Sequence, residues 1–185
     1  MTFALDLTEE QAAIKHAVEE ICAKYDDHYW LNVDNSGEFP NAFVNDIAEG
    51  GWLGVAMPES VGGAGLGLTE AALMMQTVAA SGAGFSGASA IHLNIFGLMP
   101  IVKFGTPEQQ QRFLPPAIDG TDKACFAVTE PNSGLDTSSL ETRAERANSG
   151  YRINGRKIWT TNAQRANKIL IIARTTPKHQ VKRPT

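Results

Sequence analysis

Cysteine is scarce in this sequence, and the cysteines do not have the spacing of a metal site. The 185 residues include only Cys22 and Cys125. The first lies in a helical pattern and the second in a strand pattern, so both are predicted to be buried thiols in a reduced compartment. A disulfide framework and a zinc-type centre are both disfavoured. We therefore predict no metal site.

Charge and long apolar runs are also scarce. Charged residues make up 19% of the chain and the formal net charge is −4, which gives no reason to expect nucleic acid or an anionic membrane as a partner. The basic residues Lys178, Lys182 and Arg183 favour a solvated loop over a binding patch. Residues 1–8 lack a signal-peptide pattern and no apolar run reaches membrane length. We expect no membrane span and, for a bacterial protein, a cytoplasmic location; a cleaved organelle address stays open for a mature chain.

Helical patterns fill roughly the first 120 residues. Thr8 to Gln11 match a capping box, and apolar residues at helical spacing predict a first helix that runs to about Tyr29. A loop follows over 32–39. Further helices are predicted from Pro40 to Gly50, from a Thr69 cap to about Ala80, over 88–104, and from Thr106 to the prolines at 115 and 116.

Two glycine-rich stretches invite a phosphate-binding interpretation that the sequence does not support. Residues 52–68 lack the Lys-Ser/Thr of a P-loop, so a tightly packed loop is favoured. Gly82 to Gly87 match G-x-G-x-x-G, but they follow a helix rather than a strand, and we reject a dinucleotide site there. His92 is alone in its helix, which favours a packed histidine over a catalytic one.

From Lys123 onward the pattern changes to strand, turn and strand. Alternation over 140–147, a turn at 148–150 and residues 151–154 predict a hairpin, and 157–161 and 168–175 are predicted to be extended. The fold class is therefore α+β, with an all-α domain over 1–120 and an incomplete antiparallel β domain over 121–185. Residues 169–173 are apolar on both faces and require cover. We expect a longer protein, or a second polypeptide that completes the sheet.

Two stretches of this second part carry the chemistry. Residues 126–137, FAVTEPNSGLDT, begin as a strand and break at Pro131 into a turn of small residues, where Gly134 can take a positive φ. Residues 157–162, KIWTTN, place an aromatic ring beside two hydroxyls. Backbone N–H groups and hydroxyls at the edge of a flat apolar wall suit a planar heterocycle or a phosphate, as in a flavin. Taken without any relative, Trp159 suits a sheet core better than a flavin contact.

These stretches resemble the flavin-binding signature of the acyl-CoA dehydrogenase family. The similarity extends over 150–162, GYRINGRKIWTTN. Residues 57–65, MPESVGGAG, resemble the family's loop in the N-terminal helical domain. Residues 104–109, FGTPEQ, with 113–115, FLP, resemble its last helix before the β domain. The four motifs follow the family's order and cover nearly the whole chain.

The resemblance implies FAD as cofactor. It places Phe126, Val128 and Thr129 along the isoalloxazine ring, with Thr129 hydrogen-bonding its pyrimidine side. Gly134 would let the backbone approach, and Leu135 departs from the serine that many members use for the cofactor's phosphates, leaving only its N–H. The remaining implied contacts are Trp159, which would cover the ring, and the hydroxyl pair Thr160 and Thr161, the latter near flavin N5.

The resemblance also implies an activity. Family enzymes remove the α-proton of an acyl-CoA thioester with a glutamate and pass a β-hydride to the flavin, in fatty acid metabolism among other pathways. That glutamate lies beyond Thr185, so no catalytic residue is assigned, and Glu130 and Asp136 are interpreted as loop-shaping groups. An electron-transfer flavoprotein or similar acceptor and a homotetramer are implied as partners. Ala90, Leu93, Asn94 and Gly97 are candidate walls of the acyl pocket.

Two alternatives stay open. A flavin oxidase or monooxygenase of the same fold would differ in the oxygen reactivity of its reduced flavin. A non-catalytic subunit would keep the fold and need a partner chain.

Overall fold

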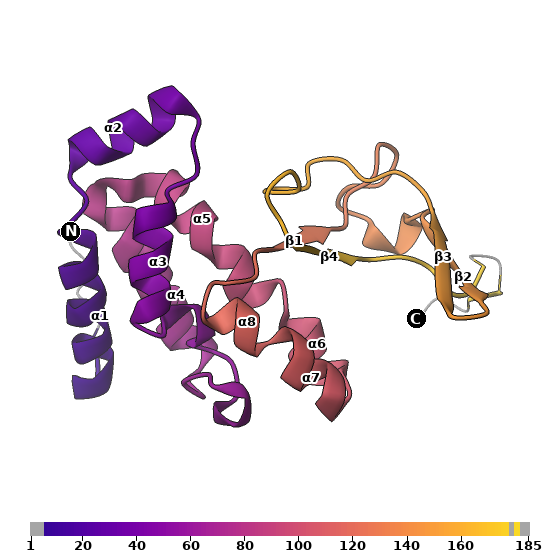
Figure 1. Cartoon of the computed structure of the whole chain (residues 1–185), viewed down its shortest axis with the longest axis horizontal. Helices are drawn as coiled ribbons and strands as arrows, with labels where there is room; N and C mark the ends of the chain where they lie inside the picture. Colours follow the sequence, from indigo (N-terminus) through magenta and orange to yellow (C-terminus); the bar gives the residue numbers. More distant parts are fainter. Residues whose placement is uncertain (1–5, 178–179, 182–185) are drawn as a thin grey trace. The chain divides into compact units, whose positions relative to one another are not determined.

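The structure, a computed structural model of the chain, describes residues 6–177, 180 and 181. It divides into two compact units, Met1–Lys123 and Ala124–Thr185, the first helical and the second built from strands and loops (Figure 1). The α+β expectation is confirmed. The predicted boundary lies near Gly120, and the observed division follows Lys123. The predicted basic cluster at Lys178, Lys182 and Arg183 lies outside the described residues.

The helical unit contains eight α-helices among its described residues. They are α1 (Glu9–Cys22), α2 (Asp27–Ser36), α3 (Asn41–Glu49), α4 (Leu68–Val78), α5 (Gly84–Phe96), α6 (Met99–Phe104), α7 (Pro107–Phe113) and α8 (Pro115–Ile118). Short 3₁₀ helices occupy Trp52–Gly54 and Glu59–Val61, and a π-helical turn occupies Ala79–Ala83.

The first predicted helix begins where expected and ends too early. The capping box at Thr8 is present, with Gln11 N–H donating to Thr8 Oγ1 at 3.2 Å. However, α1 ends at Cys22, and Asp26 caps the separate helix α2 by accepting from the Tyr29 N–H at 2.9 Å. Residues predicted as loop are therefore helical as far as Ser36, where Gly37 (φ 65°) ends α2. The prediction of one long helix was wrong because an Asp cap outweighed continued periodicity.

The middle helices also begin and divide differently from the prediction. Gly67, not Thr69, is the N-cap of α4, and the Glu70 carboxylate accepts from the Gly67 N–H at 3.0 Å. The predicted helix over 88–104 divides into α5 and α6 around Gly97 and Leu98. The G-x-G-x-x-G stretch lies in the π-helical turn and the start of α5, so it follows a helix as predicted.

The stretch Leu68–Phe104 is long and apolar enough to cross a membrane, with a mean hydropathy of 1.4 in an 18-residue segment that is 44% buried. Core helices of soluble proteins can have the same length and composition. In this stretch the backbone is non-helical at Gly82 (φ 97°, ψ −23°), and α4 and α5 contact each other. The absence of a span therefore stays a prediction.

The core of this unit is apolar and tightly packed. Phe43, Ile47, Leu53 and Met74 are fully buried, and the ring of Phe43 meets that of Trp30 edge-on at 5.1 Å. Such burial is the main stabilising term for a small helical domain.

The glycine-rich loop is closely packed as predicted. A side chain at Gly63 would place Cβ 2.3 Å from the carbonyl oxygen of Met57. The Ala64 N–H donates to the Gly54 carbonyl at 3.0 Å, which brings the two arms of the loop together. Glycine is needed here for close backbone approach rather than for phosphate binding.

The second unit contains β1 (Ala124–Ala127), β2 (Arg143–Ala147), β3 (Gly150–Asn154) and β4 (Lys168–Ile171). Strands β2 and β3 form the predicted antiparallel hairpin, with Arg143 opposite Asn154. Strands β1 and β4 pair in parallel, with Ala124 opposite Lys168, which the sequence analysis did not predict. A parallel pair needs a long connection, and here the whole hairpin lies between the two strands.

Two further strand predictions have mixed outcomes. Residues 157–161, predicted to be extended, form no strand, and Trp159 has φ 56°. Ile169 and Ile171 on β4 are 49% and 36% exposed, so the apolar face of this strand lacks cover within the part of the chain that the structure describes.

Candidate functional site

The two predicted cofactor-binding stretches lie side by side at the end of β1. The Ile158 N–H donates to the carbonyl of Thr129 at 3.0 Å, and the Lys157 ammonium donates to the carbonyl of Val128 at 2.7 Å. Strand β1 is fixed in turn by β4, since the Ile172 N–H donates to the carbonyl of Ala127 at 3.0 Å. Residues about 30 positions apart are thus brought together by one backbone and one side-chain hydrogen bond.

The turn after β1 is held by its own hydrogen bonds. Glu130 and Ser133 exchange N–H···O bonds of 3.0 and 3.2 Å, and the Ser133 hydroxyl donates to the carbonyl of Asp136 at 2.7 Å. Gly134 does not have a positive φ and has open space where a Cβ would lie, so that prediction was wrong. The turn is already closed by the hydrogen bonds between Glu130 and Ser133, so it does not need a glycine in the left-handed conformation at position 134.

The loop beyond this turn presents backbone donors. Gly134 and Leu135 are both exposed, and neither N–H has an acceptor among the described residues. Asp136 ends the loop, because its carboxylate accepts from the Ser138 N–H at 3.1 Å. Two neighbouring N–H groups on a small-residue loop suit an anionic oxygen.

The second stretch carries an unusual backbone. Trp159 (φ 56°) and Asn162 (φ 62°) are the non-glycine residues with positive φ in the described part of the chain. The left-handed conformation costs about 1–2 kcal/mol for such residues and recurs at ligand sites. The indole of Trp159 is 85% exposed, so the described residues do not bury it in a sheet core. An exposed flat ring on a strained backbone is typical of a binding wall.

The predicted contact residues fall into two groups. Phe126, Val128, Thr129 and Thr160 are half-buried, whereas Gly134, Leu135, Trp159 and Thr161 are exposed. The structure brings Thr129 next to Ile158, the residue before Trp159. In the described residues no hydrogen bond or ring contact joins the Gly134–Leu135 loop to 159–161. Whether these eight residues contact a cofactor stays a prediction.

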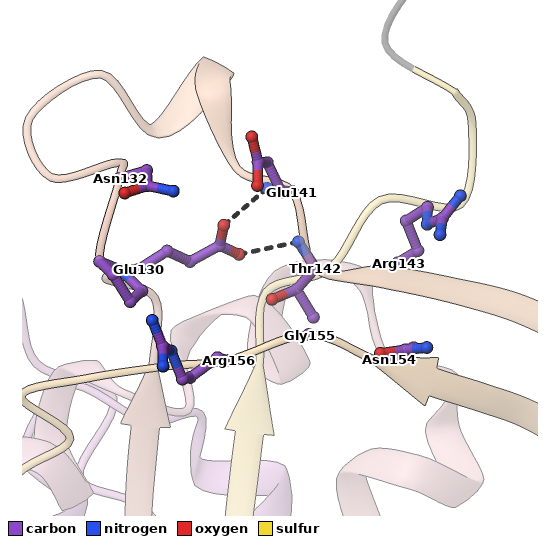
Figure 2. Close-up of a pocket in the computed structure, with 9 residues that line it drawn as sticks. Glu130, Asn132, Glu141, Thr142, Arg143, Asn154, Gly155 and Arg156 are labelled. Atoms are coloured by element: carbon purple, nitrogen blue, oxygen red, sulfur yellow. Dashed lines mark hydrogen bonds between the residues drawn. The ribbon is translucent and has the colours of Figure 1, made fainter.

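Sequence reasoning missed a buried ion pair at this site. Glu130 and Lys157 have side chains only 5% and 11% exposed, and their charged atoms lie 2.9 Å apart. The Glu130 carboxylate also accepts the N–H groups of Glu141 at 2.6 Å and Thr142 at 2.9 Å (Figure 2). The interpretation of Glu130 as a loop-shaping group agrees with these bonds. Strand alternation gives no signal for it, because the most buried residues of β1, Cys125 and Ala127, have the opposite parity to Glu130.

The charge state of Glu130 follows from these contacts. Burial by itself would raise the pKa of this carboxyl. Hydrogen bonds from Thr142, from the N–H of Glu141 and from the Lys157 ammonium outweigh it and lower the pKa from 4.5 to about 2. Glu130 is therefore an anion at neutral pH, but its low pKa makes it a weak base and its oxygens already accept three hydrogen bonds, which does not suit it to be a general base.

A polar pocket adjoins this ion pair. It is lined by Glu130, Pro131, Asn132, Glu141, Thr142, Arg143, Asn154, Gly155 and Arg156 (Figure 2). None of the predicted cofactor contacts belongs to this lining. The pocket is therefore a feature of the hairpin base rather than of the predicted flavin wall.

Other residues named in the sequence analysis make contacts within the helical unit or are buried, and whether Ala90, Leu93, Asn94 and Gly97 line an acyl pocket stays a prediction. His92 Nδ1 lies 2.9 Å from the carbonyl of Ser89, and its ring packs near Phe96, in agreement with a packed histidine. The Asn94 amide is buried and donates to the carbonyl of Ala117 at 3.0 Å. Cys22 and Cys125 are buried, as predicted, and burial raises the pKa of both thiols. No cluster of three potential metal ligands occurs in the described residues.

Comparison with known proteins places these features in a family. The family profile for the N-terminal domain of acyl-CoA dehydrogenases matches residues 8–121, and that for the middle domain matches residues 125–184. A Bacillus subtilis protein named "Probable acyl-CoA dehydrogenase YngJ" is 36% identical over 172 residues, which are 92% of this chain and 44% of that protein.

Solved structures agree. A chain in a structure described as the electron transferring flavoprotein of Acidaminococcus fermentans has a TM-score of 0.81 and 31% identity, over 97% of this chain and 46% of that one. An acyl-CoA dehydrogenase from Bacillus anthracis, complexed with FAD, has a TM-score of 0.78 and 28% identity, over 91% of this chain and 29% of that one. The chain spans less than half the length of these relatives. With both of its units matched in order, it belongs to the acyl-CoA dehydrogenase family.

Proposed function

We propose that this chain supplies the flavin wall of an FAD-dependent acyl-CoA dehydrogenase that oxidises an acyl-CoA thioester at its α and β carbons. The observation that carries the proposal is the pairing of residues 128–129 with 157–158 beside the exposed, left-handed Trp159. Family membership supports the same reaction class, and the FAD complex of the Bacillus anthracis relative supports the cofactor.

The residues present fit FAD. Trp159 offers an open aromatic face, and the hydroxyls of Thr129, Thr160 and Thr161 lie on the two paired stretches, where they can bond to the polar edge of the ring. The N–H groups of Gly134 and Leu135 have no acceptor among the described residues and suit phosphate oxygens. When bound, FAD would accept the hydride from the substrate β-carbon.

The α-proton requires a base that this chain's flavin wall does not offer. Glu130 is committed to two backbone N–H groups and an ammonium, and Asp136 is committed to its own loop. We propose that the base is a carboxylate outside residues 1–185. An electron-transfer flavoprotein or similar acceptor, a homo-oligomer and a cytoplasmic location belong to the same proposal.

The test is an anaerobic visible spectrum of the protein at its full natural length, loaded with FAD and titrated with acyl-CoAs of different chain length. Bleaching of the flavin band by one of them is the expected result. A bound flavin that no acyl-CoA bleaches would contradict the dehydrogenase activity and favour an oxidase, a monooxygenase or a non-catalytic relative. Failure to bind FAD at all would overturn the assignment of Thr129, Trp159 and Thr161.

A further inference from the structure

We infer that the buried Glu130–Lys157 pair is a positioning device for the flavin, which holds Thr129 and Trp159 in a fixed relation to each other. The inference rests on the proposed function, because it concerns the residues assigned to the flavin wall. Neither charged group needs to touch the cofactor for this role.

Lys157 holds the chain on both sides of Thr129. Its ammonium donates to the carbonyl of Val128 at 2.7 Å and to the carboxylate of Glu130 at 2.9 Å. The next residue, Ile158, donates its N–H to the carbonyl of Thr129 at 3.0 Å. Three hydrogen bonds thus tie the residues around Thr129 to the two residues before Trp159. The position of the indole relative to the Thr129 hydroxyl depends on these bonds.

The partner of Lys157 is itself immobilised. The Glu130 carboxylate accepts from the N–H groups of Glu141 and Thr142 at the entrance to β2 (Figure 2). The Glu130 backbone also closes the turn with Ser133. With the side chain only 5% exposed, its rotation would break bonds that water cannot replace. A surface ion pair has no comparable constraint, because both side chains can move into solvent.

The strained backbone of Trp159 explains why such a device is useful. A left-handed φ of 56° at a tryptophan persists only where neighbouring bonds determine it. Upstream those bonds are made by Lys157 and Ile158. Downstream the Ala163 N–H donates to the carbonyl of Thr160 at 3.3 Å. Loss of the Lys157 bonds would let the segment relax toward an ordinary φ and move the indole away from its place on the flavin wall.

The experiment compares Lys157→Met with Arg174→Met in the full-length protein. Arg174 also supports this unit, since its Nε donates to the carbonyl of Leu140 at 2.6 Å, but it bonds to no predicted flavin contact. FAD affinity and the fluorescence of bound flavin are measured at a temperature where all variants are folded. We expect Lys157→Met to bind FAD at least about tenfold more weakly, as for other losses of a supporting group, and its bound flavin to be brighter because Trp159 no longer stacks on it.

The control and the double variant sharpen the result. Arg174→Met should lower the melting temperature and keep FAD affinity within about twofold, because the Arg174 side chain donates to the carbonyls of Leu140 and Ser138 and not to the ion pair. Glu130→Gln combined with Lys157→Met should bind FAD no more weakly than Lys157→Met alone, because the two groups act as one unit.

Three results would overturn an element of the account, and they are distinguishable. If the unaltered protein binds FAD and Lys157→Met binds it with equal affinity and equal fluorescence, the positioning role is wrong and the proposed function stands. If Arg174→Met loses as much affinity as Lys157→Met, the pair acts through general stability and the positioning role is again wrong. If the unaltered protein binds no FAD, the proposed function fails and this inference fails with it.

Discussion

The two units of the chain are stabilised by different interactions. In the helical unit, fully buried apolar side chains such as Phe43, Ile47 and Ile91 pack into one cluster. In the strand unit, the buried apolar residues among those described are Ala124, Cys125, Ala127 and Leu140, and buried polar residues are Glu130, Ser133 and Thr142. The first unit therefore has a large apolar core, whereas the second has few buried apolar side chains and a buried ion pair with its hydrogen bonds.

The two kinds of interaction fix the positions of groups to different degrees. Apolar contacts are non-directional and tolerate small shifts, whereas hydrogen bonds to a buried charge fix distances and angles. The predicted flavin contacts lie in the unit whose backbone is held by such bonds. The predictions below test whether the two units respond separately and for the reasons given.

The largest effect is expected from Phe43→Ala, which removes a ring that is fully buried in the helical core. The cavity and the lost burial should lower the free energy of unfolding of this unit by about 4 kcal/mol. Segment-resolved hydrogen exchange measures it, and amides of the strand unit should keep their protection. Phe85→Ala is the matched control, because Phe85 is 85% exposed and its loss should change stability by less than about 0.5 kcal/mol. Equal effects of the two variants would contradict the assigned core.

Almost as large an effect is expected from Glu130→Ala, in the other unit. It would leave the Lys157 ammonium and two backbone N–H groups without their acceptor, which costs roughly 3–4 kcal/mol for a buried pair. Exchange protection should fall in 124–177 and persist in α1 to α5. Glu141→Ala is the control, since Glu141 contributes its N–H and not its carboxylate. Loss of protection in both units alike would show that they do not respond separately.

Acid should lower the free energy of unfolding of the strand unit by up to about 3 kcal/mol relative to that of the helical unit. The pKa of Glu130 is lowered from 4.5 to about 2 in the folded protein, so its contribution is complete above pH 4.5 and is lost as the pH falls toward 2. The strand unit should therefore lose exchange protection over this window before the apolar core does. Glu130→Gln, which has no proton to gain, should flatten that dependence. An unchanged profile in Glu130→Gln would refute the assignment of the acid response to this group.

The smallest effect concerns helix capping in the helical unit. Thr8→Ala should lower stability by about 1 kcal/mol, because Thr8 Oγ1 accepts from the Gln11 N–H at the start of α1. Thr69→Ala should change stability by only a few tenths of that, because Gly67 is the N-cap of α4. Thermal unfolding followed by helical circular dichroism measures both. If Thr69→Ala lowered stability more than Thr8→Ala, Thr69 would be the N-cap of α4, as the sequence predicted, and the assignment of Gly67 would be wrong.

Local signals in the sequence predicted some of this structure. The capping box at Thr8, the helix start at Thr106 and the hairpin predicted over 140–154 depend on neighbouring residues. All three are present, with the hairpin strands at 143–147 and 150–154. The break between α1 and α2 was missed, because helical periodicity continued through the Asp26 cap. The site was predicted as two separate stretches. Their pairing through Lys157 and Glu130, and the left-handed Trp159, depend on contacts about 30 residues apart that no local pattern encodes.

The most direct test of the account is an equilibrium titration of FAD into the full-length protein and its Trp159→Leu variant, followed by flavin fluorescence. We predict that the unaltered protein binds FAD with strongly quenched fluorescence, because the exposed indole stacks on the ring. The variant should bind it more weakly, and the bound flavin should be brighter. Equal affinity and equal quenching in the two proteins would contradict the assignment of Trp159 to the flavin wall.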